Sequence, residues 1–78
     1  MIAQNLKYLR KRNKISQQKL ADHLGIARST LGDYERGKTE PNIEMLLNMS
    51  KYFDVTVDAL INSNISHRDL EIIRNKDM

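Results

Sequence analysis

Residues 16–37 constrain the fold of this chain most, because their apolar residues and glycines fit two short helices joined by a tight turn. Leu20, Ala21 and Leu24 are spaced as one buried stripe of a helix requires. Gly25 follows directly, and a glycine there can end a helix in the left-handed conformation without a Cβ clash. The apolar pattern restarts with the next residue. We therefore expect two amphipathic helices that meet at a steep angle.

The length and composition of the chain exclude several classes of protein. Its 78 residues make at most one domain, whose core is marginal unless helices pack efficiently or a second copy adds surface. Without cysteine and with two isolated histidines, it offers neither a disulfide framework nor a metal site. No apolar run has the length of a signal peptide or a membrane span. We expect a cytoplasmic protein that needs no cofactor, metal or membrane.

The positive charge of the chain is concentrated in its first half. Residues 1–38 contain nine Lys or Arg and three acidic residues, a balance of +6, whereas the remainder contains four basic and seven acidic residues, a balance of −3. Attraction to phosphates requires such a one-sided field. A solvated basic surface explains the same pattern, and charge alone favours that simpler interpretation.

Helical periodicity predicts an all-α fold of five helices, with a short C-terminal helical tail. The five are expected over residues 2–12, after the N-cap Ser16, over residues 28–35 before Gly37, after the N-cap Asn42, and after the N-cap Thr56. Ala27 is a poor cap for the third helix, so its first amides are left for another acceptor, such as a DNA phosphate.

The last two helices and the tail carry the remaining apolar residues. The fourth helix has a core-facing stripe, which comprises Ile43, Leu46, Met49, Ser50 and Phe53. In the fifth, Leu60 and Ile61 cannot point the same way, so one is left for a partner. A final helix is predicted from Ser66, with Asp69 three residues on and Ile65 and Leu70 as a hydrophobic staple.

Residues 1–61 resemble the helix-turn-helix domain of lambdoid phage repressors and Cro, the xenobiotic-response-element (XRE) class. The resemblance is carried by LKYLRKRNKISQQKLADHLGI, ARSTLGDYERGKTEPN and IEMLLNMSKYFDVTVDALI, in the order and spacing of the family. It implies a compact lambda-repressor-like domain over residues 1–61, with residues 62–78 as a linker or short helix. The implied function is regulation of transcription through double-stranded DNA, most simply repression, and not catalysis.

The resemblance places the third helix in the major groove. The predicted base-reading residues are Arg28, Ser29, Thr30, Gly32 and Asp33. Arg28 is the strongest of them, because guanidinium can fork to O6 and N7 of guanine; a phosphate contact is its alternative. Gly32 and Asp33 share the outward side with Ser29. Asp33 either accepts from cytosine N4, or repels phosphates and orients Arg36 or Arg28.

A second set of residues is predicted to contact the DNA backbone. It comprises Gln17, Gln18, Tyr34, Arg36, Lys38, Thr39 and Asn42. Gln17 stands in the first turn of the second helix, where its amide can meet a phosphate; a plain surface glutamine is the alternative. Tyr34 suits a border position, with its ring in the core and its hydroxyl on the backbone.

Arg10 and Glu35 are predicted to form a structural ion pair, since similar domains pair these two positions. The pair would tie the first helix to the end of the third, and losing one partner would strand a buried charge.

The resemblance also implies a homodimer on a pseudo-palindromic operator, with half-sites roughly 34 Å apart. The apolar candidates for the dimer contact are Leu47, Ile61, Leu70 and Ile73. An alternative is a protein-interaction module, such as an antitoxin or adaptor, because an exposed apolar face looks the same for either partner. Catalysis is not indicated: His23 and His67 have no nucleophile system beside them, and His23 is expected to be solvated.

Overall fold

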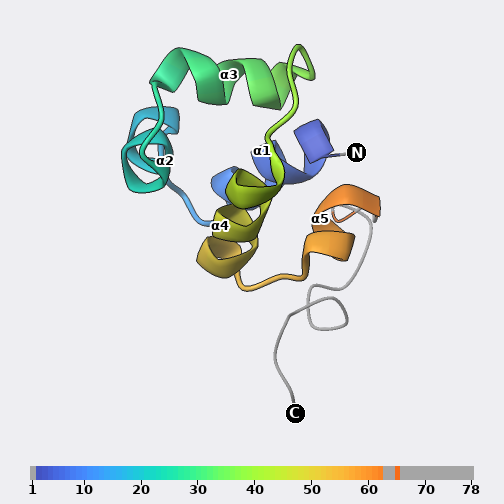
Figure 1. Ribbon diagram of the computed structural model, residues 1–78. Coiled ribbons are helices and arrows are strands. Elements are labelled where there is room, and N and C mark those ends of the chain that lie inside the picture. The colour runs from blue at the N-terminus through green and yellow to red at the C-terminus, as the bar shows by residue number, and fades with distance from the viewer. Residues whose placement is uncertain (1, 63–64, 66–78) are drawn as a thin grey trace.

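The computed structural model describes residues 2–62 and 65, which form five α-helices (Figure 1). They are α1 (Ile2–Arg12), α2 (Gln17–Leu24), α3 (Arg28–Arg36), α4 (Ile43–Phe53) and α5 (Val57–Asn62). The predicted all-α fold and its five helices are confirmed, and α3 continues one residue further than expected. The helix predicted from Ser66 lies outside the described residues. None of the described helices is both long and apolar enough to cross a membrane.

The helices begin and end where local chemistry predicts. Ser16, Asn42 and Thr56 each accept a hydrogen bond from the backbone N–H three residues on, at 3.0, 2.8 and 3.0 Å. Gly25 and Gly37 end α2 and α3 with φ of 75° and 76°, a conformation that costs glycine little. These stops set the short turn before α3 and the loop after it.

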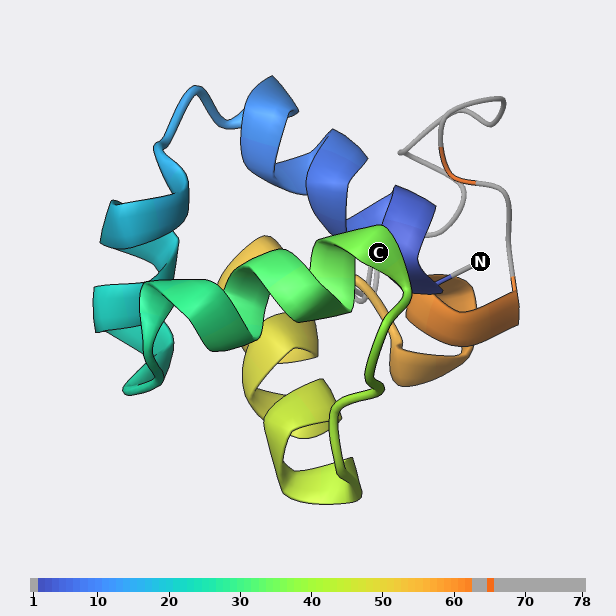
Figure 2. The ribbon, with the colours of Figure 1, turned by 90° about the horizontal axis from the view of Figure 1, so that it is seen from above.

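Each helix contributes a fully buried side chain to one core. Leu6, Leu20, Leu31, Met49 and Leu60 all have 0% exposure, and they come from α1 to α5 in turn. Burying such a side chain contributes about 1.5–3 kcal/mol. In Figure 1, α3 lies at the top of the bundle, and in Figure 2 it faces the viewer. One face of α3 is therefore anchored, and the opposite face lies on the outside of the molecule.

The structure corrects the predicted stripe of α4 at its first residue. Ile43, expected in the core, is 71% exposed. The start of α4 extends away from the other helices (Figure 2), which agrees with the exposure of its first residue. Leu60 and Ile61 of α5 were predicted to point in different directions, and this is confirmed: Leu60 is fully buried and Ile61 is 38% exposed.

Asn5 is a buried polar residue that the sequence analysis did not single out. Its side-chain amide donates to the carbonyl of Leu60 at 2.8 Å, and its oxygen accepts the N–H of Ile65 at 3.1 Å. Ile65 itself is fully buried in the core. Asn5 thus connects α1 to α5 and to Ile65; the predicted domain boundary at residue 61 stays a prediction.

Candidate nucleic-acid interface

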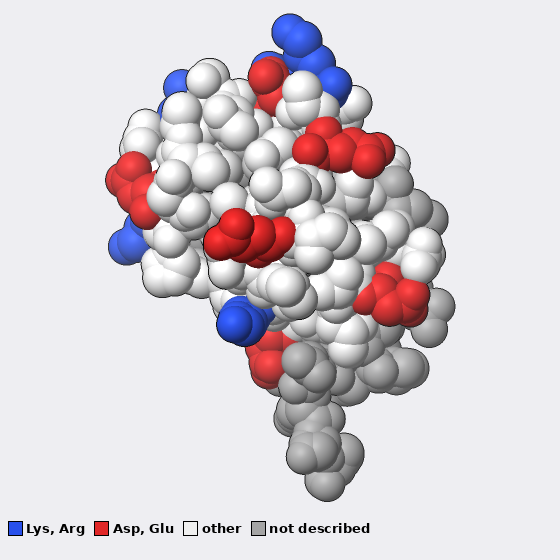
Figure 3. Space-filling view, viewed as in Figure 1, with Lys and Arg blue, Asp and Glu red and all other residues white. Residues whose placement is uncertain are grey.

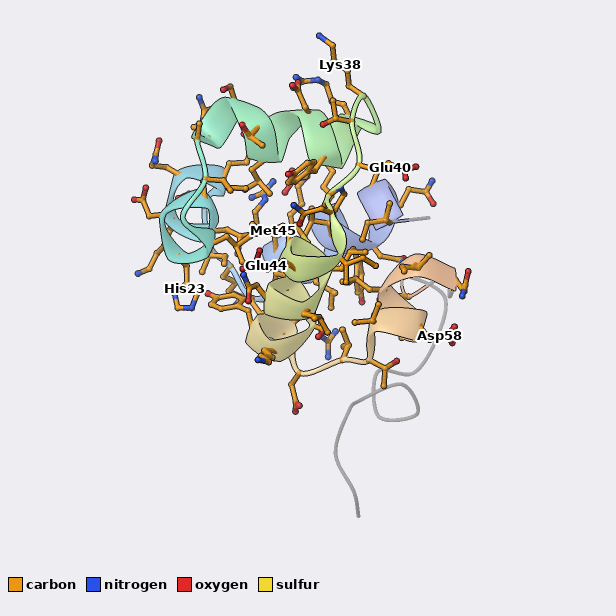
Figure 4. The ribbon with its side chains drawn as sticks, in the orientation of Figure 1. His23, Lys38, Glu40, Glu44, Met45 and Asp58 are labelled. Carbon is orange, nitrogen blue, oxygen red and sulfur yellow. The ribbon has the colours of Figure 1, made fainter. Side chains whose placement is uncertain are left out.

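The candidate interface is the outward side of α3 together with the loop that follows it. Leu31 locks the inner side of the helix into the core, while Arg28 and Ser29 are exposed and Thr30 is half-buried. In Figure 4, Lys38 points away from the body of the molecule, just beyond the end of α3. This side of α3 therefore presents guanidinium, hydroxyl and ammonium groups to the solvent.

Charge is unevenly distributed around this surface. In Figure 3, the most protruding basic atoms lie at the upper edge, over the end of α3, whereas the face below carries several acidic groups with fewer basic ones among them. Glu40 and Glu44 lie on that lower face, in the loop and in the first turn of α4 (Figure 4). An anionic polymer would meet the α3 side with less repulsion than the α4 side.

The beginning of α3 is also suited to an anion. Ala27 occupies the N-cap position with extended backbone and makes no side-chain capping hydrogen bond, as the sequence predicted. The N-terminus of a helix presents backbone N–H groups and a partial positive charge to its surroundings. Arg28 stands at this end, so the exposed guanidinium and the helix terminus favour the same kind of ligand.

Gly32 is buried, because the side chain of Arg36 covers it on the outward side of α3. A Cβ built on Gly32 would lie 3.1 Å from Nη1 of Arg36, so glycine leaves room for the guanidinium. Nη2 of Arg36 donates to a carboxylate oxygen of Asp33. Of the roles left open for Asp33, the geometry therefore favours orientation of Arg36; a base contact by either residue stays a prediction.

The two glutamines of α2 differ in their exposure and in their hydrogen-bond partners. Gln17 is half-buried, and its Nε2 donates to Oε1 of Glu35 at 3.0 Å. The exposed Gln18 donates to the Asp22 carboxylate at 2.8 Å, within its own helix. The sequence pattern did not reveal the bond of Gln17, because its partner is in another helix. The predicted contact of Gln17 with the DNA backbone would have to use the other N–H of its side-chain amide.

The loop after α3 places the other predicted backbone residues along one edge. Lys38 and Thr39 are exposed, and Asn42 is exposed while its side chain caps α4. Tyr34 is half-buried and packs against the core, the border position that the sequence predicted for it. Whether these side chains contact phosphates stays a prediction.

Arg10 and Glu35 form a nearly buried, two-pronged ion pair between α1 and α3. Nε of Arg10 lies 2.7 Å from Oε2 of Glu35, and Nη2 donates to Oε1 at 3.1 Å. The two side chains are only 11% and 3% exposed. Nη1 of Arg10 also donates to the carbonyl of Ile15 at 3.0 Å. The carboxylate thus holds α1, α2 (through Gln17) and α3 together beneath the candidate interface.

Among the described residues, the histidine of α2 is the remaining side chain that could have marked a second site. His23 is exposed, and its ring lies 4.3 Å from that of Tyr52, a contact between α2 and α4 that spacing alone did not indicate. Within residues 2–62 and 65, no three His, Cys, Asp or Glu side chains come together as metal ligands would.

The sequence is similar to a known protein family and to known regulators of transcription. The helix-turn-helix family model matches residues 6–60. The chain is 44% identical over 61 residues to the uncharacterized HTH-type transcriptional regulator YqaE of Bacillus subtilis, covering 78% of this chain and 53% of YqaE. It thus spans about half the length of that relative.

Two solved structures resemble the fold closely. The P22 c2 repressor in complex with a synthetic operator has a TM-score of 0.77 at 31% identity, over 82% of this chain and 97% of that one. The N-terminal DNA-binding domain of SinR from Bacillus subtilis has a TM-score of 0.75 at 35% identity, over 87% of this chain and 97% of that domain.

Proposed function

The chain belongs to the helix-turn-helix family of the XRE, or Cro and C1, type, and from this premise we propose that it binds specific sites on double-stranded DNA and represses transcription there. The observation that carries the proposal is the polarity of α3. Leu31 is fully buried on one side, while Arg28 and Ser29 are exposed on the other. A recognition helix needs this arrangement, because base edges must meet polar side chains that the protein does not cover.

In the proposed complex, α3 enters the major groove with its N-terminal end leading. Arg28 forks to O6 and N7 of a guanine, and Ser29 and Thr30 contact neighbouring base edges. Lys38 and Thr39 contact phosphates beside the groove, which sets the register of the helix without reading sequence. Repression follows if the occupied site overlaps the path of RNA polymerase.

Replacing Arg28 by alanine is expected to cost about 1–3 kcal/mol in binding to the preferred site and to relax the preference at one base pair. The preferred site would first be selected from a random duplex library with the unmodified chain. Titrations at several salt concentrations then compare the two proteins on that site and on its single-base variants.

Lys38→Ala is the matched control for Arg28→Ala. It should weaken binding to all sequences alike and reduce the salt dependence by about one ion. Equal weak binding of the unmodified chain to every duplex would overturn sequence-specific recognition.

The active form we propose is a homodimer on a pseudo-palindromic site, with half-sites roughly 34 Å apart. Its apolar contacts include Leu47 and Ile61, which are 46% and 38% exposed, and extend to Ile43 at 71%. Exposed apolar side chains on neighbouring helices favour a protein partner, and a second copy satisfies two-fold symmetry. The other candidates, Leu70 and Ile73, lie outside the described residues.

Leu47→Glu is expected to shift the chain from dimer to monomer in light scattering on a sizing column. The substitution should leave the helix content unchanged, because the side chain is partly in solvent already. Lys19→Glu provides the control, since it places the same charge at an exposed position of α2, which is not among the helices proposed for the dimer contact. A monomer at every concentration, with and without the selected site, would refute the dimer. Tight binding of an unrelated protein instead would favour the adaptor function.

A further inference from the structure

We propose that Arg36 reads a base, that Asp33 orients it, and that Gly32 provides the space in which it lies. This inference deepens the proposed function and rests on it. The sequence pattern had placed Arg36 among the phosphate contacts and had left the role of Asp33 open. The three residues form one arrangement in the structure, and each part of it has a separate observation behind it.

The first observation is the direction of the Arg36 side chain. Side chains of a helix lean toward its N-terminus, so a long side chain at position 36 reaches back over the preceding turn. Its guanidinium lies above Gly32, 3.1 Å from where a Cβ would stand. This brings the charge from the end of α3 toward the middle of its outward side. Ser29 and Asp33 share that side, because residues four apart lie above one another.

The second observation is the pairing with Asp33. Nη2 of Arg36 donates to the Asp33 carboxylate, with side chains 65% and 29% exposed. The bond uses one of several N–H donors of the guanidinium, and the others remain for a ligand. A carboxylate on this surface would otherwise repel phosphates, and the pair neutralises it. Asp33 also restricts the rotamers of Arg36, which lowers the entropy that a bidentate contact to guanine would lose.

The proposal is tested on the base pair whose preference depends on Arg36. The site selected by the unmodified chain is varied one base pair at a time, and the ratio of Kd values between preferred and other bases is measured for Arg36→Ala. We expect this ratio to fall about 5- to 150-fold at one guanine-containing pair. A loss of affinity that is equal at all positions would identify a phosphate contact and overturn the proposal, while leaving the proposed function intact.

Asp33→Ala distinguishes a role of Asp33 in orienting Arg36 from a direct contact between Asp33 and a base. We expect it to raise affinity for all sequences, since a negative charge is removed, yet to reduce discrimination at the same base pair as Arg36→Ala. The double variant should discriminate no worse than Arg36→Ala alone, because Asp33 acts through Arg36. If Asp33 instead accepts from cytosine N4, the two single variants change preference at different base pairs, and the proposal is wrong.

Gly32→Ala tests whether the space over Gly32 is needed, while the charged groups of Asp33 and Arg36 both remain. The added methyl would lie 3.1 Å from Nη1, so the guanidinium must shift by a few tenths of an ångström, and discrimination at that base pair should fall by part of the Arg36→Ala effect. Alanine is the better helix former, so the melting temperature should be unchanged or higher. Lys38→Ala is the control that lowers affinity while leaving the discrimination ratio unchanged. Full discrimination by Gly32→Ala would overturn the role proposed for Gly32. A wild-type chain that selects no sequence would refute the proposed function itself.

Discussion

Replacing Glu35 by alanine is expected to lower the free energy of unfolding by about 3–5 kcal/mol, because the substitution strands a buried charge. The side chain of Arg10 is 11% exposed, and its guanidinium donates two hydrogen bonds to the Glu35 carboxylate. Without that acceptor it retains the bond to the Ile15 carbonyl. Gln17 loses its partner as well. A domain of this size has a total stability of only about 5–15 kcal/mol, so the loss would be a large part of it.

The measurement is urea denaturation of the unmodified chain, Glu35→Ala and the control Arg36→Ala, followed by circular dichroism. Arg36 forms an ion pair too, but its side chain is 65% exposed, and surface pairs contribute about 0–1 kcal/mol. The midpoint of Glu35→Ala should therefore lie well below that of the control. Equal midpoints for the two variants would mean that the Arg10–Glu35 pair does not stabilise the fold.

The same pair connects the fold to the candidate interface. Glu35 is in the last turn of α3, and its two partners, Arg10 and Gln17, belong to α1 and α2. Holding these three helices fixes the angle at which the exposed side of α3 meets a ligand. A site built on rigid elements binds without first losing conformational entropy. For this reason a variant at Glu35 is a test of the fold and should not be used to assign DNA contacts.

Local chemistry made most of the fold predictable. A helix cap acts within three residues, and a glycine stop acts at a single φ, so Ser16, Asn42, Gly25 and Gly37 could be assigned without knowing their neighbours. The apolar period of each helix likewise depends on its own residues. The ion pair of Arg10 was predicted because a family resemblance supplied a contact that spacing alone does not give.

Contacts between distant segments were not predictable in this way. Gln17 was predicted to contact the DNA backbone, with a plain surface position as the alternative, because its bond to Glu35 exists only once α2 and α3 have packed. Ile43 fitted the stripe of α4, but the period of a helix does not show where the neighbouring helices stop covering it. Arg36 was predicted to contact phosphates, since nothing in its spacing shows that Gly32 leaves room for its guanidinium. In each case the missing information was the position of a second element.

Asn5→Leu is expected to lower the free energy of unfolding by about 3 kcal/mol, although leucine has the same branched shape and the site is in the core. The Asn5 amide joins α1 to the end of α5 through the carbonyls of Leu60 and Ala59, at 2.8 and 3.4 Å. Its oxygen accepts the N–H of Ile65. Leucine can replace none of these bonds, and each buried polar group left without a partner costs about 1–3 kcal/mol.

The matched control for Asn5→Leu is Asn62→Leu, in which the same change is made at an exposed residue of α5. Asn62 bonds only to Asp58 of its own helix among the described contacts, so little stability should be lost. Amide hydrogen exchange gives the sharper measurement, because the N–H of Ile65 should lose protection in Asn5→Leu before those of α2 and α3 do. If Ile65 kept its protection relative to them, packing rather than Asn5 would hold this residue, and the expected loss would shrink to the effect of a core substitution.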